Sequence, residues 1–202
     1  MRIFDFFNYF VIDLNSVQTM KIKSVTVFCG SKSGNQLGYT HQATELGNAL
    51  GEAGIQLVYG GGGKGIMGAI ADAVLSKNGK VLGVIPKLLL EWEAQHEGLT
   101  ELIVTETMHD RKKILYDKAD LAIILPGGMG TMDELFEMLT WNNLNIHQKK
   151  VIILNWEGFY TPLITLMDHM HAEGFMYDNW RNRITIASDA KEVMDAIIFL
   201  SE

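Results

Sequence analysis

Residues 121–134 of the chain read LAIILPGGMGTMDE, an apolar run followed by a glycine-rich turn and an acidic residue. The run at 121–125 is apolar on both faces, which is typical of a buried parallel strand. The residues from 131 to 144 then predict a helix. A strand, a glycine loop and a helix in this order form part of a βαβ unit.

The same alternation recurs from residue 21 to the C-terminus. Six further runs rich in valine and isoleucine predict strands, at 24–28, 55–59, 80–85, 101–104, 151–154 and 183–186. Helices are predicted between them, at 38–53, 65–77, 110–118, 160–173 and 190–200. This alternation favours a parallel sheet with helices on both faces, and no linker or repeat interrupts it. We therefore expect a single α/β domain, doubly wound and mainly parallel, with about seven strands over residues 21–202.

Composition and charge argue against several classes of function. The 202 residues fit one domain with a substantial core. The formal net charge is −7 and the longest basic run has only three residues, Arg111 to Lys113, so no nucleic-acid partner is expected. The single cysteine, Cys29, follows an apolar run and is predicted to be buried, which agrees with a reducing compartment. We expect a cytoplasmic protein.

Residues 1–20 differ from the rest of the chain. Five aromatic side chains alternate there with polar ones, at positions 4, 6, 7, 9 and 10. The segment has neither the clean apolar stretch nor the small-residue cleavage site of a signal peptide. It is also too short and too polar to cross a bilayer. We expect an N-terminal extension that packs on the body or on a partner, and no association with a membrane.

Two glycine clusters follow predicted strands. The first, at 60–68, reads GGGGKGIMG, and the second, at 126–134, reads PGGMGTMDE. Ligands of open α/β sheets bind beyond the carboxyl ends of the strands. Glycines let the backbone approach a ligand closely, and the helix behind each loop offers free N–H groups. Each loop alone is equally explained as a tight turn, but together they predict an anion site, most naturally for phosphate.

The first loop does not fit two common nucleotide-binding templates. Its glycines at 63, 65 and 68 have the GxGxxG spacing of dinucleotide-binding folds. Those folds also require an acidic residue at the end of the next strand. Residues 84–87 read VIPK, without an acid, so NAD is disfavoured. Lys64 is followed by Gly65 rather than by Ser or Thr, so the P-loop template fails as well. No set of metal ligands stands out, and we expect neither a metal nor a cofactor.

Charged residues accompany the second loop. Arg111 lies near the start of the helix that precedes strand 121–125, and it suits bidentate contact with a phosphate or a carboxylate. Glu134 ends the segment quoted first. Each has a plainer interpretation: Arg111 as a solvated surface residue, and Thr131 with Glu134 as a capping box at the helix start. Their convergence at one edge of the sheet favours a functional site.

These residues resemble the LOG family of cytokinin riboside 5′-monophosphate phosphoribohydrolases, long mislabelled as lysine decarboxylases. Residues 126–134 fit the PGGxGTxxE signature of the family. The resemblance covers residue 21 to the C-terminus and continues at 27–31, 58–62, 67–68, 83–86 and 108–112. It implies a Rossmann-like fold, usually a homodimer. The implied activity is hydrolysis of a nucleoside 5′-monophosphate to a free base and ribose 5-phosphate.

The resemblance also implies roles for individual residues. Arg111 and Glu134 match the catalytic pair. Substrate-contact positions are matched by Glu93, Lys112, Gly128, Gly130, Thr131 and Thr140, and the neighbouring glycines Gly61, Gly62 and Gly127 are expected to bind phosphate. The chain departs from its relatives at 142–143, where Asn-Asn replaces a common Ala-Gln, and at Lys150, where proline is common. The preferred base, adenine or N6-prenylated adenine, is left open.

Three other functions are compatible with the same loops. A nucleotide-binding sensor or carrier needs the loops but not the carboxylate of Glu134. A carrier of a nucleotide sugar or of molybdenum cofactor need not have the full PGGxGTxxE signature. A dehydrogenase is least expected, because the required acid is absent. The residues favour an N-glycosidase whose small-molecule partner is a nucleoside monophosphate.

Overall fold

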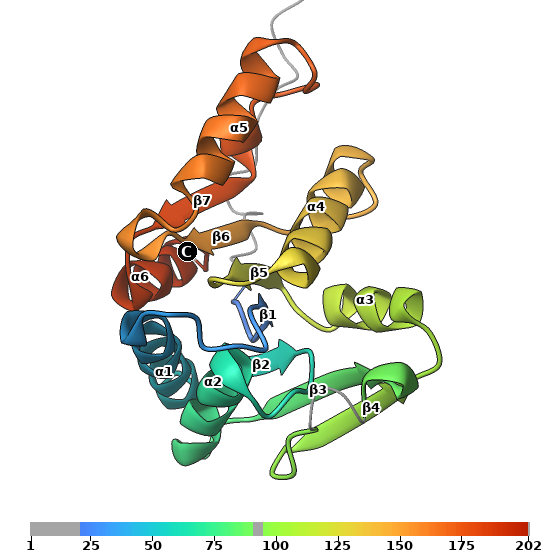
Figure 1. Cartoon of the computed structure of the whole chain (residues 1–202), viewed down its shortest axis with the longest axis vertical. Helices are drawn as coiled ribbons and strands as arrows, with labels where there is room; N and C mark the ends of the chain where they lie inside the picture. Colours follow the sequence, from blue (N-terminus) through green and yellow to red (C-terminus); the bar gives the residue numbers. More distant parts are fainter. Residues whose placement is uncertain (1–20, 91–94, 202) are drawn as a thin grey trace, which may run out of the picture.

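The structure is a computed structural model, and it describes residues 21–90 and 95–201. These residues form a parallel sheet of seven strands with helices on both faces (Figure 1). The strands are β1 (Ser24–Phe28), β2 (Gln56–Tyr59), β3 (Val81–Pro86), β4 (Glu101–Thr105), β5 (Leu121–Ile124), β6 (Val151–Leu154) and β7 (Ile184–Ala187). The predicted doubly wound α/β fold is confirmed, and each strand begins and ends within one residue of its predicted bounds.

The longer helices of the described residues are α1 (Leu37–Glu52), α2 (Gly65–Ser76), α3 (Met108–Asp117), α4 (Met129–Asn143), α5 (Thr161–Ala172) and α6 (Ala190–Leu200). Short 3-10 turns, which were not predicted, are η2 (Lys87–Leu89), η3 (Trp156–Gly158) and η4 (Trp180–Asn182). Helices α1, α2 and α6 cover one face of the sheet, and α3, α4 and α5 cover the other. None of the helices in the described part of the chain is long and apolar enough to cross a bilayer. The predicted N-terminal extension, residues 1–20, lies outside the described residues.

The strand order is β4-β3-β2-β1-β5-β6-β7, and every neighbouring pair is parallel. The chain first winds outward from β1 to β4, and α3 then returns it to β5 on the other side of β1. The winding direction therefore reverses between β1 and β5. Open α/β sheets bind their ligands at such a switch point.

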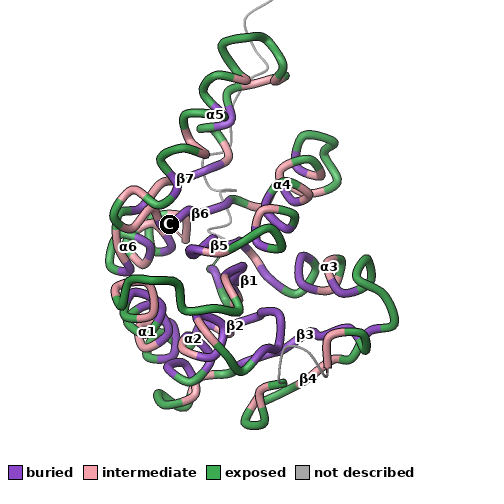
Figure 2. Tube along the Cα trace, viewed as in Figure 1, coloured by how far each residue is buried: buried purple, intermediate pink, exposed green. Residues whose placement is uncertain are grey.

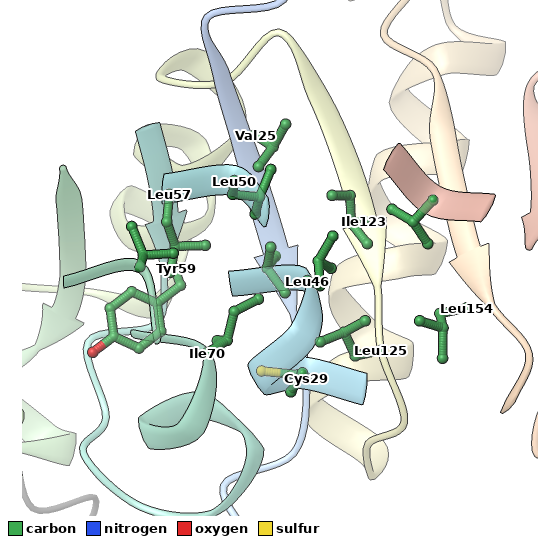
Figure 3. Packing of buried hydrophobic residues seen from close by; sticks show 14 of the residues in the cluster. Val25, Cys29, Leu46, Leu50, Leu57, Tyr59, Ile70, Ile123, Leu125 and Leu154 are labelled. Atoms are coloured by element: carbon green, nitrogen blue, oxygen red, sulfur yellow. The ribbon is translucent and has the colours of Figure 1, made fainter. Parts of the chain in front are cut away.

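The central strands are buried on both faces (Figure 2). On one face, Leu46 and Leu50 of α1 pack over β1, β2 and β5 (Figure 3). On the other face, the ring of Tyr116 in α3 lies edge-on to Phe28 of β1, with centroids 5.8 Å apart. Burial on both faces explains why these strands are continuous apolar runs in the sequence. This packing holds in place the carboxyl ends of β1 and β5, where the candidate site lies.

Candidate active site

A cavity of about 440 Å³ lies at the carboxyl ends of β1 and β5. Its volume is in the range of small-molecule sites. The loops that follow these two strands form much of its lining, together with side chains from α1 to α4. Of the predicted site residues, the cavity includes Arg111, Gly127, Gly128, Gly130, Thr131 and Glu134.

The second glycine loop forms the wall of the cavity at the start of α4. Helix α4 begins at Met129 with Gly128 as its N-cap, and no side chain caps it. The first N–H groups of an α-helix have no partner within the helix, and the helix dipole makes this end attractive to anions. A side chain at Gly128 or at Gly130 would meet nothing within 4 Å, so both glycines border open space. This geometry leaves room for an anion against the backbone.

The capping-box interpretation of Thr131 and Glu134 is wrong. Because α4 begins at Met129, Thr131 is its third residue and Glu134 its sixth, too far along to cap the helix start. The hydroxyl of Thr131 instead lies against Gly127, where a side chain would come within 2.1 Å of it. Glu134 is only 6% exposed and lines the cavity from the second turn of the helix.

Arg111, on the first turn of α3, is also buried, at 3% exposure. Its Nε donates a hydrogen bond to the carbonyl of Val84 at 3.0 Å, and one terminal nitrogen donates to the carbonyl of Gly60 at 3.3 Å. The other terminal nitrogen lies 4.0 Å from a carboxylate oxygen of Glu134. Two backbone carbonyls thus hold the guanidinium beside the carboxylate. The interpretation of Arg111 as a solvated surface residue is wrong.

Lys112, the next residue, joins α3 to α4. Its ammonium lies 2.7 Å from Glu137 and 3.1 Å from Asp133. Burial lowers the pKa of Lys112, but the hydrogen bonds and charges of Glu137 and Asp133 outweigh this effect, so the pKa is raised overall. Tyr116 of α3 adds a second link, because its hydroxyl donates to Glu137 at 3.0 Å and lies 3.1 Å from the carbonyl of Glu134. These contacts hold together the two helices that carry the buried charges.

The first glycine loop is shaped largely by packing within the chain. Gly65, the first residue of α2, has a φ of +61°, and a side chain there would lie 2.5 Å from the backbone of Ser31. A side chain at Gly60 would lie 2.3 Å from a terminal nitrogen of Arg111. Both glycines are therefore required by contacts between elements of the same chain.

Gly61 and Gly62, which the sequence predicted to bind phosphate, do not line the cavity. Gly61 has a φ of +82°, and its carbonyl accepts a hydrogen bond from the backbone of His96 at 3.0 Å. Gly62 forms an isolated antiparallel bridge with Gln95. The backbone of these two glycines is thus paired with the segment at 95–96, and only the α2 residues that follow the loop reach the cavity.

Two other predicted contacts, Thr140 and Lys112, are not part of this cavity. Thr140 is exposed on α4, and its hydroxyl donates to the carbonyl of Phe136 at 2.7 Å. The ammonium of Lys112 is held by its two acidic partners on α4. Glu93 falls outside the described residues. Within one chain, neither Thr140 nor Lys112 lines the cavity.

The cavity also includes residues that were not predicted. Gly30, Ser31 and Lys32 line it from the loop after β1. Tyr39 of α1 and Phe159 after η3 also line it, with ring centroids 5.6 Å apart. The Gly-Ser pair directly after a buried strand is a signal that could have identified the first group. No comparable signal marks Tyr39 or Phe159.

This arrangement combines an uncapped helix start with a carboxylate and a guanidinium held together in a buried position. Backbone amides of a helix start can bind a phosphate, and a buried carboxylate can stabilise developing positive charge or orient a water molecule. In the part of the chain that the structure describes, no three His, Cys, Asp or Glu side chains are placed to hold a metal ion.

Comparison with known proteins places the chain among nucleotide-processing enzymes. A family model described as "Possible lysine decarboxylase" matches residues 67–197. The cytokinin riboside 5′-monophosphate phosphoribohydrolase of Rhodococcoides fascians is 42% identical over 176 residues, which cover 87% of this chain and 89% of the relative. The corresponding LOG1 protein of Arabidopsis thaliana is 44% identical over 174 residues, 86% of this chain and 82% of the relative.

Solved structures share the fold at lower sequence identity. The molybdenum cofactor binding protein of Rippkaea orientalis superposes with a TM-score of 0.69 at 21% identity, covering 91% of this chain and 99% of that chain. The molybdenum cofactor carrier protein of Chlamydomonas reinhardtii gives a TM-score of 0.67 at 19% identity, covering 88% and 96%. At these identities the likeness concerns the fold alone.

Proposed function

The chain belongs to the LOG family of cytokinin riboside 5′-monophosphate phosphoribohydrolases, and on that premise we propose that it hydrolyses the N-glycosidic bond of adenosine 5′-monophosphate or an N6-modified form of it. The products are the free base and ribose 5-phosphate. One observation carries the proposal: the charged groups of Arg111 and Glu134 are buried 4.0 Å apart, in a cavity that also contains an uncapped helix start. The reaction would activate cytokinin-type nucleotides or degrade AMP.

Cleavage of the bond to the base builds positive charge on the ribose. Glu134 stabilises this charge near the C1′ atom or orients the attacking water. Arg111 holds the carboxylate in place and contacts the ribose hydroxyls with its remaining N–H groups, since two of its nitrogens already donate to backbone carbonyls. Both side chains are almost fully buried, so their mutual attraction is less screened than on a surface.

The 5′-phosphate binds where α4 begins. The backbone of Gly128, Gly130 and Thr131 lines the cavity there, and the uncapped helix end supplies N–H donors. The phosphate does not react, but its binding energy positions the glycosidic bond at Glu134.

The direct test is chromatography of the purified protein incubated with AMP and, separately, with isopentenyladenosine monophosphate. Wild type is expected to release free base from at least one of them, and the faster substrate identifies the preferred base. Glu134→Gln preserves the size of the side chain and is expected to lower turnover by about 10²-fold or more, as for other acid–base groups. Near-normal turnover in this variant would remove Glu134 from the mechanism.

A nucleotide-binding sensor or carrier is the main alternative. It would use the same helix start but would not need a buried carboxylate beside a fixed guanidinium. Tight binding of AMP in calorimetry, with no product from wild type, would favour this alternative over hydrolysis.

We also propose a homodimer that forms through α4. Exposed apolar side chains lie along this helix and beside it, at Phe136, Leu144 and Ile146, with Met108 of α3. Phe136, Thr140 and Leu144 are four residues apart and so share one face of α4. Thr140 lies outside the cavity of its own chain, so the substrate contact that the resemblance implies for it requires a second chain.

Light scattering tests the dimer. Wild type is expected to have twice the mass of one chain. Leu144→Asp, which places a charge in the proposed interface, is expected to shift the protein to the monomer. Leu37→Asp makes the same change at an exposed leucine on α1 and is expected to leave the dimer intact. A wild-type mass of one chain would contradict the dimer.

We propose further that residues 21–202 fold as one domain, that residues 1–20 form an extension of it, and that the protein works in the cytoplasm. The only cysteine, Cys29, is buried, and a lone cysteine forms no disulfide within the chain, which is typical of a reducing compartment. A chain of residues 21–202 is expected to unfold in urea in one cooperative transition. Two transitions would contradict the single domain.

A further inference from the structure

The cavity contains a cation that the proposed mechanism does not use. Lys32, on the loop between β1 and α1, lines the cavity and is exposed. None of the described residues forms an ion pair or a hydrogen bond with its ammonium. The other ionisable lining residues that carry opposite charges are Arg111 and Glu134, which lie beside each other. Because those two charges offset, Lys32 gives the described lining of the cavity a net positive charge.

Arg111 is poorly placed to meet an additional anion. Its Nε and one terminal nitrogen donate to the carbonyls of Val84 and Gly60, and its side chain is almost fully buried. Its remaining terminal nitrogen faces Glu134. Moving the guanidinium toward a phosphate would leave two buried carbonyls without these donors, which is costly.

The loop that carries Lys32 lies directly against the loop that precedes α4. The backbone of Gly30 donates a hydrogen bond to the carbonyl of Pro126 at 3.0 Å. A side chain at Gly30 would lie only 3.4 Å from the Cα of Gly127. Lys32 follows two residues later, and its long flexible side chain carries three N–H donors. Lys32 and the first residues of α4 therefore line one cavity, on loops that contact each other.

The start of α4 and the ammonium of Lys32 are both positive, so an anion bound between them would be attracted by both. None of the described side chains supplies that anion, because α4 has no side-chain cap and Lys32 has no acidic partner among these residues. A phosphate at this position would satisfy both groups with charge-assisted hydrogen bonds. The base and ribose of a nucleotide are neutral and would not.

We propose that Lys32 binds the 5′-phosphate of the substrate against the first N–H groups of α4, and that it thereby sets the preference for nucleotides over nucleosides. This inference rests on the proposed function, because it names the residue that recognises the phosphate at the same site. Lys32 then binds the phosphate, while Arg111 contacts the ribose and Glu134.

The test compares wild type with Lys32→Gln, Lys32→Arg and the control Lys80→Gln. Lys80 is exposed at the opposite edge of the sheet, just before β3, and its substitution changes the net charge by the same amount. In steady-state hydrolysis of AMP, Lys32→Gln is expected to raise KM about tenfold or more and to change kcat by less than about threefold, because the lost contact is to a group that does not react. Lys32→Arg is expected to recover part of the loss, and Lys80→Gln to behave as wild type.

Calorimetry with ligands that have or lack a phosphate shows which part of the nucleotide Lys32 binds. Lys32→Gln is expected to weaken binding of ribose 5-phosphate about tenfold or more and to leave adenosine binding unchanged. Unchanged KM and unchanged ribose 5-phosphate binding, in a wild type that does release base, would overturn the role of Lys32 and leave the proposed function standing. Equal weakening of both ligands would also overturn it, since the loop would then be distorted. A wild type that releases no base refutes the hydrolase, and the two binding measurements still decide the role of Lys32.

Discussion

The loop after β2 and the loop after β5 are both rich in glycine, and both follow a central strand of the sheet. In the first loop the glycines meet other parts of the chain, as Gly65 does with the backbone of Ser31. In the second, Gly128 and Gly130 border open space in the cavity. The comparison teaches that glycine has two separate uses here: it permits close packing at Gly65 and access for a ligand at Gly128 and Gly130.

The position of each strand explains the difference. β5 borders the switch point, where the helices of the two halves diverge and leave space beyond the sheet. β2 lies one strand away, and the backbone after it is paired with the segment at 95–96.

Gly65→Ala is expected to give the largest loss of stability, because it combines a positive φ with a backbone overlap. A side chain there would lie 2.5 Å from Ser31, and φ is +61°. Strain and overpacking together are expected to lower the free energy of unfolding by about 3 kcal/mol. Urea unfolding measures it, and a loss below about 0.5 kcal/mol, the range of neutral surface substitutions, would contradict the packing role of the first loop.

Gly60→Ala is expected to act on activity through Arg111. The added side chain would lie 2.3 Å from a terminal nitrogen of the guanidinium, which must then leave its position beside Glu134. Turnover is expected to fall about 10- to 100-fold, since small displacements of catalytic groups have effects of this size. Steady-state kinetics test the loss, with circular dichroism as the control for folding. Wild-type kcat in a folded variant would show that Arg111 need not be held at this position.

Gly128→Ala is the counterpart in the second loop. The new side chain meets nothing within 4 Å but enters the space in front of the α4 amides. Stability is expected to change by less than about 0.5 kcal/mol, while KM for the nucleotide rises about tenfold. A variant that loses stability but binds substrate normally would reverse the assignment of the two loops.

Lys112→Gln is expected to lower the free energy of unfolding by only about 1 kcal/mol and to leave both loops as they are, because it removes partly buried ion pairs between α3 and α4. The pKa of Lys112 is raised above its ordinary value of 10.5, so the folded state holds this proton more tightly than the unfolded state. The stabilisation is therefore fully present below pH 10.5 and is lost as the pH rises through the raised pKa. Urea unfolding of both proteins from pH 7 upward checks this. A difference that grows above pH 10.5 would contradict it.

Much of the fold could be predicted because the buried parallel strands are apolar runs separated by helical segments of ordinary length. The start of α4 could not. Gly130 stands inside the first turn of this helix, and a glycine there hides the helical pattern. The helix was therefore expected to begin at Thr131, which produced the incorrect capping box.

The site was predicted only in part, because some of its residues are brought together only by the order of the strands. Arg111, Glu134 and the second glycine loop carry recognisable side chains or spacing. The contribution of Ser31 and Lys32 depends on β1 lying beside β5. That neighbour relation follows from the direction in which α3 returns the chain, and the local sequence does not encode it in a recognisable pattern.

The most direct test of the division between the loops is amide NMR of the Glu134→Gln protein titrated with AMP, since this variant should bind the nucleotide without consuming it. The account predicts that the largest changes in amide chemical shift occur at Gly128, Gly130 and Thr131, and at Ser31 and Lys32. Gly61 and Gly62 should remain unchanged. Shifts centred on Gly61 and Gly62, with none at Gly128 and Gly130, would contradict the account.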